Sequence, residues 1–527
     1  MLGKRSVQRG MFEADHVFGD FVGRETFYGF LASQRGELFR DEDFAILYCA
    51  TNGRPSVSPG LLATALVLQT FCNVSDDEAT QRATYDLRWK VALGIEMDSR
   101  PFAKSTLQEF RAQLIVQKAA GTIFQESLEA AKRHGYFRRE RKLKLALDTS
   151  NILGRGAVKD TYHLLADGIL AVLRILAGQA GQELGPFGRE QGYGRYVSGT
   201  SLKGQVELDW SDDSQRRSFL QEIVADADRL LEAVRVVRGG LEPGSLADTE
   251  LAEAAGVLSR VLGQDIERRP DGAAIREGVA PDRLVSVHDP EMRHGRKSAS
   301  KRFDGHKCAL ATDTDDQFIT AVAVTAGNAP DDEAALDLVK DSEQRTGCEV
   351  EEVYGDCAFG DGETRQAFAE AGQRLIAKVP ACTNRGRFPK TAFALDLDKM
   401  TCTCPAGEVT RTLRTRQNGD QGAHFAFPAA VCAACPLREQ CIRGSGGRAI
   451  TLHPQEALLQ EARRVQASPA FQEVRRRRQT VEHRIARCIQ LGLRQARYFG
   501  RTKTLFQVLL TAAVANLTLL ANLVQVG

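Results

Sequence analysis

The sequence has almost no excess of charge of either sign. Its 70 Lys and Arg residues nearly balance 68 Asp and Glu residues, which leaves a formal net charge of +2. The overall charge therefore does not predict a polyanionic partner. The 527 residues, of which 43% are hydrophobic, are enough for about two to four domains with sizeable cores.

The sequence also lacks the features of an exported or membrane protein. Residues 1–20 are mixed and polar, so we expect no signal peptide. The only long apolar stretch is residues 504–526, and it contains Gln507, Asn516 and Asn522. We interpret this stretch as a buried core helix, with a membrane span as the alternative. The sequence predicts a cytoplasmic protein whose twelve cysteines are metal ligands or free thiols rather than disulfides.

A short apolar stretch that ends on an acid forms the first candidate site. In residues 142–151, KLKLALDTSN, leucine occupies alternate positions, which predicts a strand with one well-buried face. We expect the strand to end at Asp148. A carboxylate at the carboxyl edge of a sheet is half solvated, can stay ionised and can hold a hard divalent cation. Asp148 is therefore a candidate metal ligand.

Two further acids are expected to join Asp148. Residues 349–356, EVEEVYGD, predict a second strand that ends at Asp356. Residues 475–490 carry apolar side chains at helical spacing, and Glu482 flanks that apolar stripe. Neighbouring strands would bring the two Asp backbones within roughly 5 Å, and the helix would place Glu482 over the rim of the sheet. Each acid alone is more often a turn residue or a salt-bridge partner, so the prediction depends on all three together.

An Asp after a first strand, an Asp after a later strand and a Glu on a late helix resemble the DDE transposases of bacterial insertion sequences. Arg478 and Glu482 also match the Tyr-x2-Arg-x3-Glu-x6-Lys signature of one large group of them, whereas Arg475 and Ile489 stand where the signature has Tyr and Lys. Further matching stretches are DTSNILGRGAVKDTYHLL at 148–165, DPEMRHGRKSASKRFDGHK at 289–307 and GNAPDDEAA at 327–335. The resemblance extends through most of the chain after residue 140.

The resemblance implies a fold of the α/β class (mixed α+β) with a ribonuclease-H-like core. In such a core, helices flank a five-stranded sheet with parallel and antiparallel strands. We predict a helical N-terminal domain over residues 1–140, for DNA binding or dimerisation, and a catalytic domain over residues 141–527. Two insertions are expected within the catalytic domain. The first is helical and covers residues 150–285, and the second is Cys-rich and covers residues 381–465.

The resemblance also implies the chemistry. Two Mg²⁺ or Mn²⁺ ions would be held by Asp148, Asp356 and Glu482 for DNA cleavage and strand transfer at the ends of an insertion sequence. The expected partner is double-stranded DNA, both element ends and target, bound by a homodimer at the bacterial nucleoid in the cytoplasm. The alternative is a domesticated or inactive transposase that acts as a DNA-binding regulator, and metal-dependent nicking of DNA distinguishes the two.

Basic residues surround the third acid and predict a phosphate-binding surface. A solvated helical face is the alternative interpretation of such a run. The candidate DNA-binding residues are Arg475, Arg476, Arg477, Arg478, Arg484, Arg487, Arg494, Arg497, Arg501 and Lys503.

The Cys-rich insertion holds a second candidate metal site. Cys402 and Cys404 precede a Cys432-x2-Cys435-x5-Cys441 cluster. Two cysteine clusters that converge are typical of a tetrahedral zinc site. A small segment with little apolar content needs a bound metal or a similar cross-link to be stable. We predict a structural zinc ion on four of these thiols, with Cys402 left out. Unligated thiols are one alternative. An iron–sulfur cluster is the other, because the spacing resembles that of some iron–sulfur nucleases.

Overall fold

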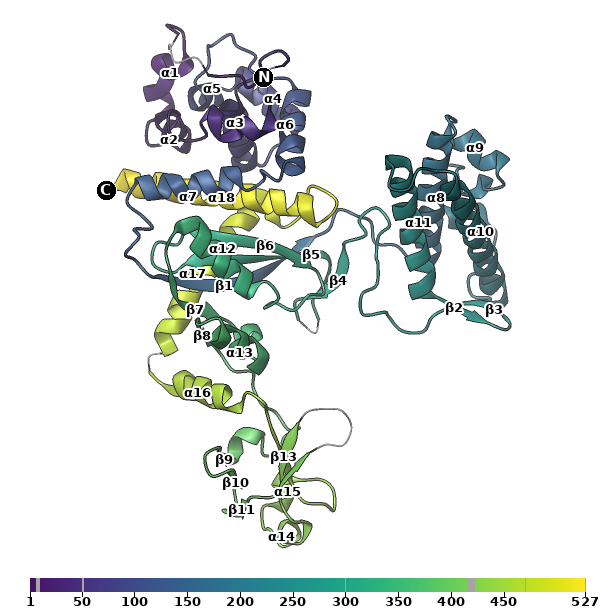
Figure 1. Cartoon of the computed structure of the whole chain (residues 1–527), viewed down its shortest axis with the longest axis vertical. Helices are drawn as coiled ribbons and strands as arrows, with labels where there is room; N and C mark the ends of the chain where they lie inside the picture. The colour runs from purple at the N-terminus through teal and green to yellow at the C-terminus, as the bar shows by residue number, and fades with distance from the viewer. Residues whose placement is uncertain (6–9, 50–51, 299, 416–421, 470, 527) are drawn as a thin grey trace.

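The computed structural model describes residues 1–5, 10–49, 52–298, 300–415, 422–469 and 471–526. Its largest sheet lies at the centre of the molecule (Figure 1). Within the described residues this sheet has six strands, β4, β5, β6, β1, β7 and β8. Their bounds are Arg293–Arg296 for β4, Arg302–Asp313 for β5, Ile319–Ala326 for β6, Leu143–Leu153 for β1, Val350–Gly355 for β7 and Arg374–Ala377 for β8.

The strand order is that of a ribonuclease-H-like sheet. β5 pairs antiparallel with β1 on one edge and with β6 on the other, while β7 and β8 continue the sheet parallel to β1. The predicted mixed sheet flanked by helices is thereby confirmed. It has one strand more than the predicted five, because the short β4 pairs with the first residues of β5 on the edge that β6 also uses.

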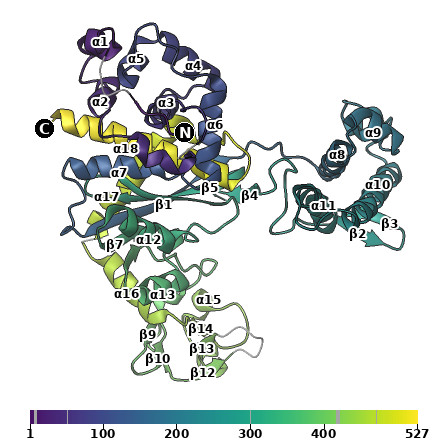
Figure 2. The same ribbon diagram turned by 45° about the horizontal axis from the view of Figure 1, so that its top comes forward.

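Helices cover the sheet on both sides (Figures 1 and 2). α17 (Phe471–Cys488) packs on β1, β5 and β7, and α12 (Ala335–Thr346) packs on β5 and β6. α18 (Arg501–Val526) lies between β6 and α7 (Thr122–Arg133). Asn516 of α18 bonds both the amide and the carbonyl of Ile319 on β6, which satisfies a buried amide side chain.

Short helices precede the sheet, as the sequence predicts. α3 begins at Pro59, where the Ser58 hydroxyl accepts a hydrogen bond from the Leu61 amide, and α4 begins after Ser75 in the same way. These helices share one hydrophobic core with the sheet. The bounds of the helices before α7 are Ala14–Val22 (α1), Phe27–Ser33 (α2), Pro59–Cys72 (α3), Asp76–Tyr85 (α4), Leu87–Leu93 (α5) and Lys104–Val116 (α6).

The segment between β1 and β4 forms a helical body with its own core, and Figure 1 shows it to one side of the sheet. It contains α8 (Thr161–Gln179), α9 (Leu184–Glu190), α10 (Asp213–Gly239), α11 (Leu246–Asp265) and the hairpin of β2 (Ile266–Arg269) and β3 (Gly272–Ile275). A helical insertion is what the sequence predicts here. The separate core forms because α8, α10 and α11 turn their apolar faces toward one another.

The Cys-rich module, residues 381–465, lies at the far end of the molecule from the N-terminal helices (Figure 1). Two small sheets and a core of a few aromatic side chains build it. Its strands are Ala394–Asp396 (β9), Thr401–Thr403 (β10), Val409–Thr410 (β11), Leu413–Thr415 (β12), Ala423–Ala426 (β13) and Ala449–Leu452 (β14). Its helices are Ala429–Ala433 (α14), Arg438–Cys441 (α15) and Glu456–Ala467 (α16), which leads into α17.

Among the described residues, two helices, Thr161–Gln179 and Arg501–Gln525, are long and apolar enough to cross a membrane. In the second, 83% of the apolar window is buried inside the protein, as expected for a core helix, and in the first 56% is buried. Core helices of soluble proteins also satisfy this criterion of length and composition.

Candidate active site

The two aspartates lie on neighbouring strands. β1 and β7 pair in parallel up to Ala146 and Tyr354, and Asp148 and Asp356 each come two residues later. Because the period of a strand is two residues, both aspartates lie on the same face as that last pair. The prediction that β1 ends at Asp148 is wrong, since its antiparallel pairing with β5 continues to Leu153. Asp148 instead lies two residues beyond the last residue of β1 that pairs with β7. At Asp148 the edge of β1 toward β7 therefore has no strand partner.

Local hydrogen bonds hold both carboxylates. Asp148 Oδ1 accepts from the Thr149 amide at 2.8 Å, and Asp356 Oδ1 accepts from the Ala358 amide at 2.8 Å. Burial raises the pKa of Asp148 to about 6. The Thr149 hydrogen bond opposes this rise, and the nearby charge of Asp356 adds to it.

Glu482 approaches from the helix layer. It lies on α17, whose Val481 and Cys488 are buried, and its own side chain is 44% exposed. Its carboxylate accepts from Arg478 at 2.6 Å, one turn earlier. The charges of Arg478 and Glu482 also act on the pKa of Asp148, in opposite directions. The structure thus brings all three predicted acids into one neighbourhood.

The donor set of this neighbourhood fits a hard divalent cation. Three carboxylates provide the oxygen ligands that Mg²⁺ and Mn²⁺ prefer, and two of them come from adjacent strands. As the side chains stand in the part of the chain that the structure describes, no three His, Cys, Asp or Glu residues are close enough together to hold a metal ion. The Glu482 carboxylate is turned toward Arg478, so it would have to leave that ion pair to become a ligand.

A polar network on the other face of β1 fixes the backbone beside Asp148. The Thr149 hydroxyl donates to Asp331 Oδ1 at 2.9 Å, and Lys307 Nζ donates to the same oxygen at 2.7 Å. The sequence alone does not predict a role for these residues. Asp331 belongs to the stretch GNAPDDEAA, one of those that resemble the family.

The predicted DNA-binding residues differ in exposure. Arg484 is buried and donates to the Ala515 carbonyl at 2.6 Å, because its position coincides with the apolar stripe of α17. Its guanidinium cannot reach a phosphate without leaving the core, so it is removed from the proposed DNA surface. The exposed members are Arg475, Arg476, Arg494, Arg501 and Lys503, and the half-buried ones are Arg477, Arg478, Arg487 and Arg497.

Several of the remaining arginines hold the protein together around the end of α17. Arg494 donates to Asn151 on β1, Arg497 to Asn73 near the N-terminal helices, and Arg501 to Glu291 before β4. Arg477 pairs with Asp315 in the turn after β5. These contacts link α17, α18 and the segment between them to four other parts of the chain, which a surface used only for DNA would not require.

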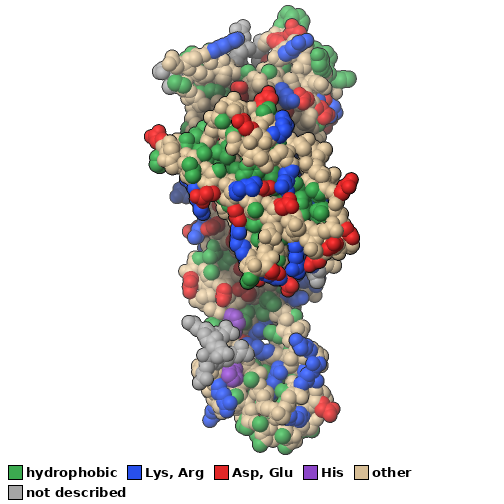
Figure 3. Space-filling model, turned by 90° about the vertical axis from the view of Figure 1, so that its right-hand side faces the viewer, with side chains coloured by type: hydrophobic (Ala, Val, Ile, Leu, Met, Phe, Trp, Pro, Cys, Tyr) green, Lys and Arg blue, Asp and Glu red, His purple; other side chains and the backbone are tan. Residues whose placement is uncertain are grey.

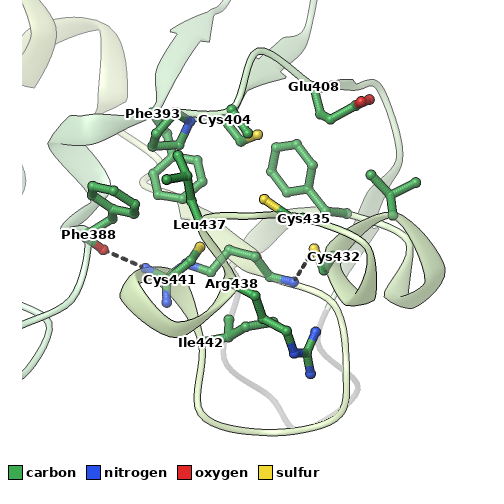
Figure 4. Close-up of a pocket in the computed structure, with 15 residues that line it drawn as sticks. Phe388, Phe393, Cys404, Glu408, Cys432, Cys435, Leu437, Arg438, Cys441 and Ile442 are labelled. Atoms are coloured by element: carbon green, nitrogen blue, oxygen red, sulfur yellow. Dashed lines mark hydrogen bonds between the residues drawn. The ribbon is translucent and has the colours of Figure 1, made fainter.

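Four thiols of the Cys-rich module line one pocket (Figure 4). Cys404 comes from the turn after β10, Cys432 and Cys435 from α14 and the residues after it, and Cys441 from the end of α15. The backbone amide of Arg448 donates to Cys432 Sγ at 3.4 Å. Cys402 is fully buried in β10 and does not line the pocket.

Two parts of the chain match models of protein families. Residues 403–521 match the Transposase DDE domain, a region that includes Glu482 but neither aspartate. Residues 19–113 match the Transposase domain (DUF772), a region that runs from the end of α1 into α6. No curated protein and no solved structure matches the chain.

Proposed function

Since the chain carries these two transposase domains and is an insertion-sequence transposase of the DDE type, we propose that Asp148, Asp356 and Glu482 are its catalytic triad. The observation that carries the proposal is the placement of both aspartates on one face of adjacent parallel strands, under a helix that supplies the glutamate. No covalent intermediate with the protein is required.

The three carboxylates would hold two Mg²⁺ or Mn²⁺ ions. When bound, such ions supply Lewis-acid stabilisation of an in-line phosphoryl displacement, first by water and then by a DNA 3′-hydroxyl. The protein holds Asp148 and Asp356 in position through backbone amides, and the network of Thr149 and Asp331 stiffens β1 beside them. Arg478 keeps the Glu482 side chain beside the site.

The proposed substrate is double-stranded DNA, first at the ends of the element and then at a target. The exposed basic residues around α17 are proposed to contact its phosphates, and the helices of residues 1–140 to recognise the element ends or to form the homodimer. This activity would place the protein in the bacterial cytoplasm, at the nucleoid.

Metal-dependent nicking of DNA tests the proposal. We expect the purified chain to nick DNA that carries the element ends with Mg²⁺ or Mn²⁺, and the Glu482→Gln variant to bind the same DNA without nicking it. Tight binding by the wild-type chain without nicking would support the alternative, a DNA-binding regulator. An unchanged nicking rate in the variant would remove Glu482 from the triad.

We further propose that the Cys-rich module holds a structural zinc ion. Four thiols from two separate segments line one pocket, and tetrahedral thiolate sites are built in this way. An amide that donates to sulfur, as Arg448 does to Cys432, also stabilises a thiolate. The small core of the module offers little other stability.

Metal analysis of protein purified without chelator tests the zinc site. We expect one zinc ion per chain, its loss in Cys435→Ser, and its retention in Cys382→Ser, a cysteine of the same module that does not line the pocket. Iron with visible absorption would indicate a cluster instead. The absence of both metals would remove the site.

A further inference from the structure

We infer that the Cys-rich module carries a DNA-binding site of its own, a pocket of arginines that takes phosphates of the DNA backbone. The inference rests on the proposed function, because it assigns part of the DNA contact to a region far from the triad. Arg385, Arg387, Arg443 and Arg448 line an open pocket together with the glycine-rich loop at residues 444–447. Among the described residues that line it, none is acidic.

The charges of these four arginines are not neutralised by acids in the described part of the chain. None of them forms an ion pair with another described residue, whereas the nearby Lys390 and Arg463 both pair with Glu456. The Nε atoms of Arg387 and Arg448 are also buried without an acceptor. A buried donor without a partner is costly, so these two side chains are not fully satisfied by the described residues.

The backbone favours the same ligand. The loop 443–448 reads RGSGGR, so two arginines flank glycines that leave their amides accessible to a close approach. At Gly447 a side chain would collide with the Phe427 carbonyl at 1.8 Å, so the loop can pass so close to the core only with glycine. Guanidinium groups bind phosphate oxygens in pairs of parallel hydrogen bonds.

The surroundings favour a polymer over a single phosphate. Arg411 and Arg414 lie exposed on and beside β12, in the same small sheet as β14, and neither forms an ion pair with a described residue. Figure 3 shows many blue and few red side chains on this face of the lower end of the molecule, where the module lies. An array of unpaired arginines suits the repeated charges of a DNA strand.

The pocket also shares its wall with the thiol site. Cys441, Ile442 and Arg448 line both. The zinc ion that we propose would therefore set the position of Arg448 and of the loop before it. This arrangement would give the cysteines a role in DNA binding without any contact to DNA.

The test measures binding of duplex DNA at several salt concentrations, in the Glu482→Gln background so that no cleavage interferes. The variant Arg385→Gln with Arg443→Gln removes two exposed charges of the pocket. Its matched control is Arg174→Gln with Arg189→Gln, two exposed arginines of the helical insertion without ion pairs to described residues. Circular dichroism checks that both variants are folded.

We expect the pocket variant to bind DNA about 10-fold more weakly and its salt slope, log K against log salt, to fall by about 1 to 2. The control should keep wild-type values. Equal losses in both variants would show an effect of net charge and overturn the inference, and so would wild-type binding by the pocket variant. Titration with inorganic phosphate alone should give no arginine-dependent binding. If inorganic phosphate does bind in a way that depends on these arginines, while DNA binding is unchanged in the variant, the ligand is free phosphate and not DNA.

Failure of this inference can be told apart from failure of the proposed function. If the wild-type chain nicks DNA with metal but the pocket variant binds DNA normally, the triad stands and the pocket assignment is wrong. If the wild-type chain neither binds nor nicks DNA, both are wrong.

Discussion

Asp148→Asn should make the metal-free protein more stable while it abolishes DNA cleavage. In the absence of metal, the half-buried Asp148 lies near Asp356, which follows the adjacent strand, and Glu482 is a third nearby acid. Two negative charges separated by the usual spacing of neighbouring strands, about 5 Å, repel by about 3 kcal/mol at an effective dielectric constant of about 20. Asparagine removes this repulsion but keeps an oxygen to accept the Thr149 hydrogen bond.

Part of that gain is offset, because Arg478 attracts the Asp148 carboxylate. We therefore expect the free energy of unfolding without metal to rise by about 1–3 kcal/mol. A protein that becomes more stable when a functional side chain is replaced has a site whose geometry favours activity over stability. Metal should stabilise the wild-type chain but not the variant and so offset the variant's higher stability. A metal concentration of 100 times the Kd stabilises the wild-type fold by about 2.7 kcal/mol.

Thermal unfolding with chelator and with Mn²⁺ measures both effects. The wild-type chain should melt at a higher temperature with Mn²⁺, and Asp148→Asn should respond little. Asp337→Asn, an exposed acid on α12 outside the triad, is the control and should respond like the wild type. The reasoning is refuted if Asp148→Asn melts at a lower temperature than the wild type in chelator and still gains stability from Mn²⁺.

Three further changes test other parts of the molecule. Glu482→Gln should abolish nicking but shift the free energy of unfolding by no more than about 0.5 kcal/mol, because its ion pair with Arg478 is partly exposed to water; a nicking assay and a urea titration check both. Burial opposes ionisation of Asp76, but hydrogen bonds led by Arg111 hold its pKa well below the usual range, so Asp76→Asn should cost about 2–3 kcal/mol at pH 7. That contribution is present above about pH 4 and is lost as the pH falls further, so urea titrations of variant and wild type should converge in acid. Gly492→Ala should cost about 1–3 kcal/mol, because Gly492 has φ of 96° and a Cβ there would lie 2.6 Å from Asn73 Oδ1; equal melting temperatures would contradict this.

The sequence predicted the strands and helices that carry the acids because their patterns are local. Alternating leucines identify β1, and apolar residues at helical spacing identify α17. The end of β1 was predicted wrongly because antiparallel pairing with β5, a contact distant in the sequence, extends the strand past Asp148. β4 was missed since RHGR has no apolar pattern and pairs only through its backbone.

The buried position of Arg484 could have been found from the sequence. It lies three residues after Val481 and four before Cys488, so helical spacing places all three on one face. The charge of the residue favoured a surface position, and the backbone acceptor at Ala515 that makes burial possible comes from a distant part of the chain. The arginine pocket could not be found, because its members come from two segments more than fifty residues apart.

Anomalous diffraction from crystals grown with Mn²⁺ tests the catalytic site most directly. We predict two Mn²⁺ peaks about 4 Å apart, ligated by Asp148 and Asp356, with the Glu482 carboxylate turned from Arg478 to the metal. Mn²⁺ peaks elsewhere, with no density between the two aspartates, would contradict the proposal that these three acids form a two-metal centre for DNA cleavage.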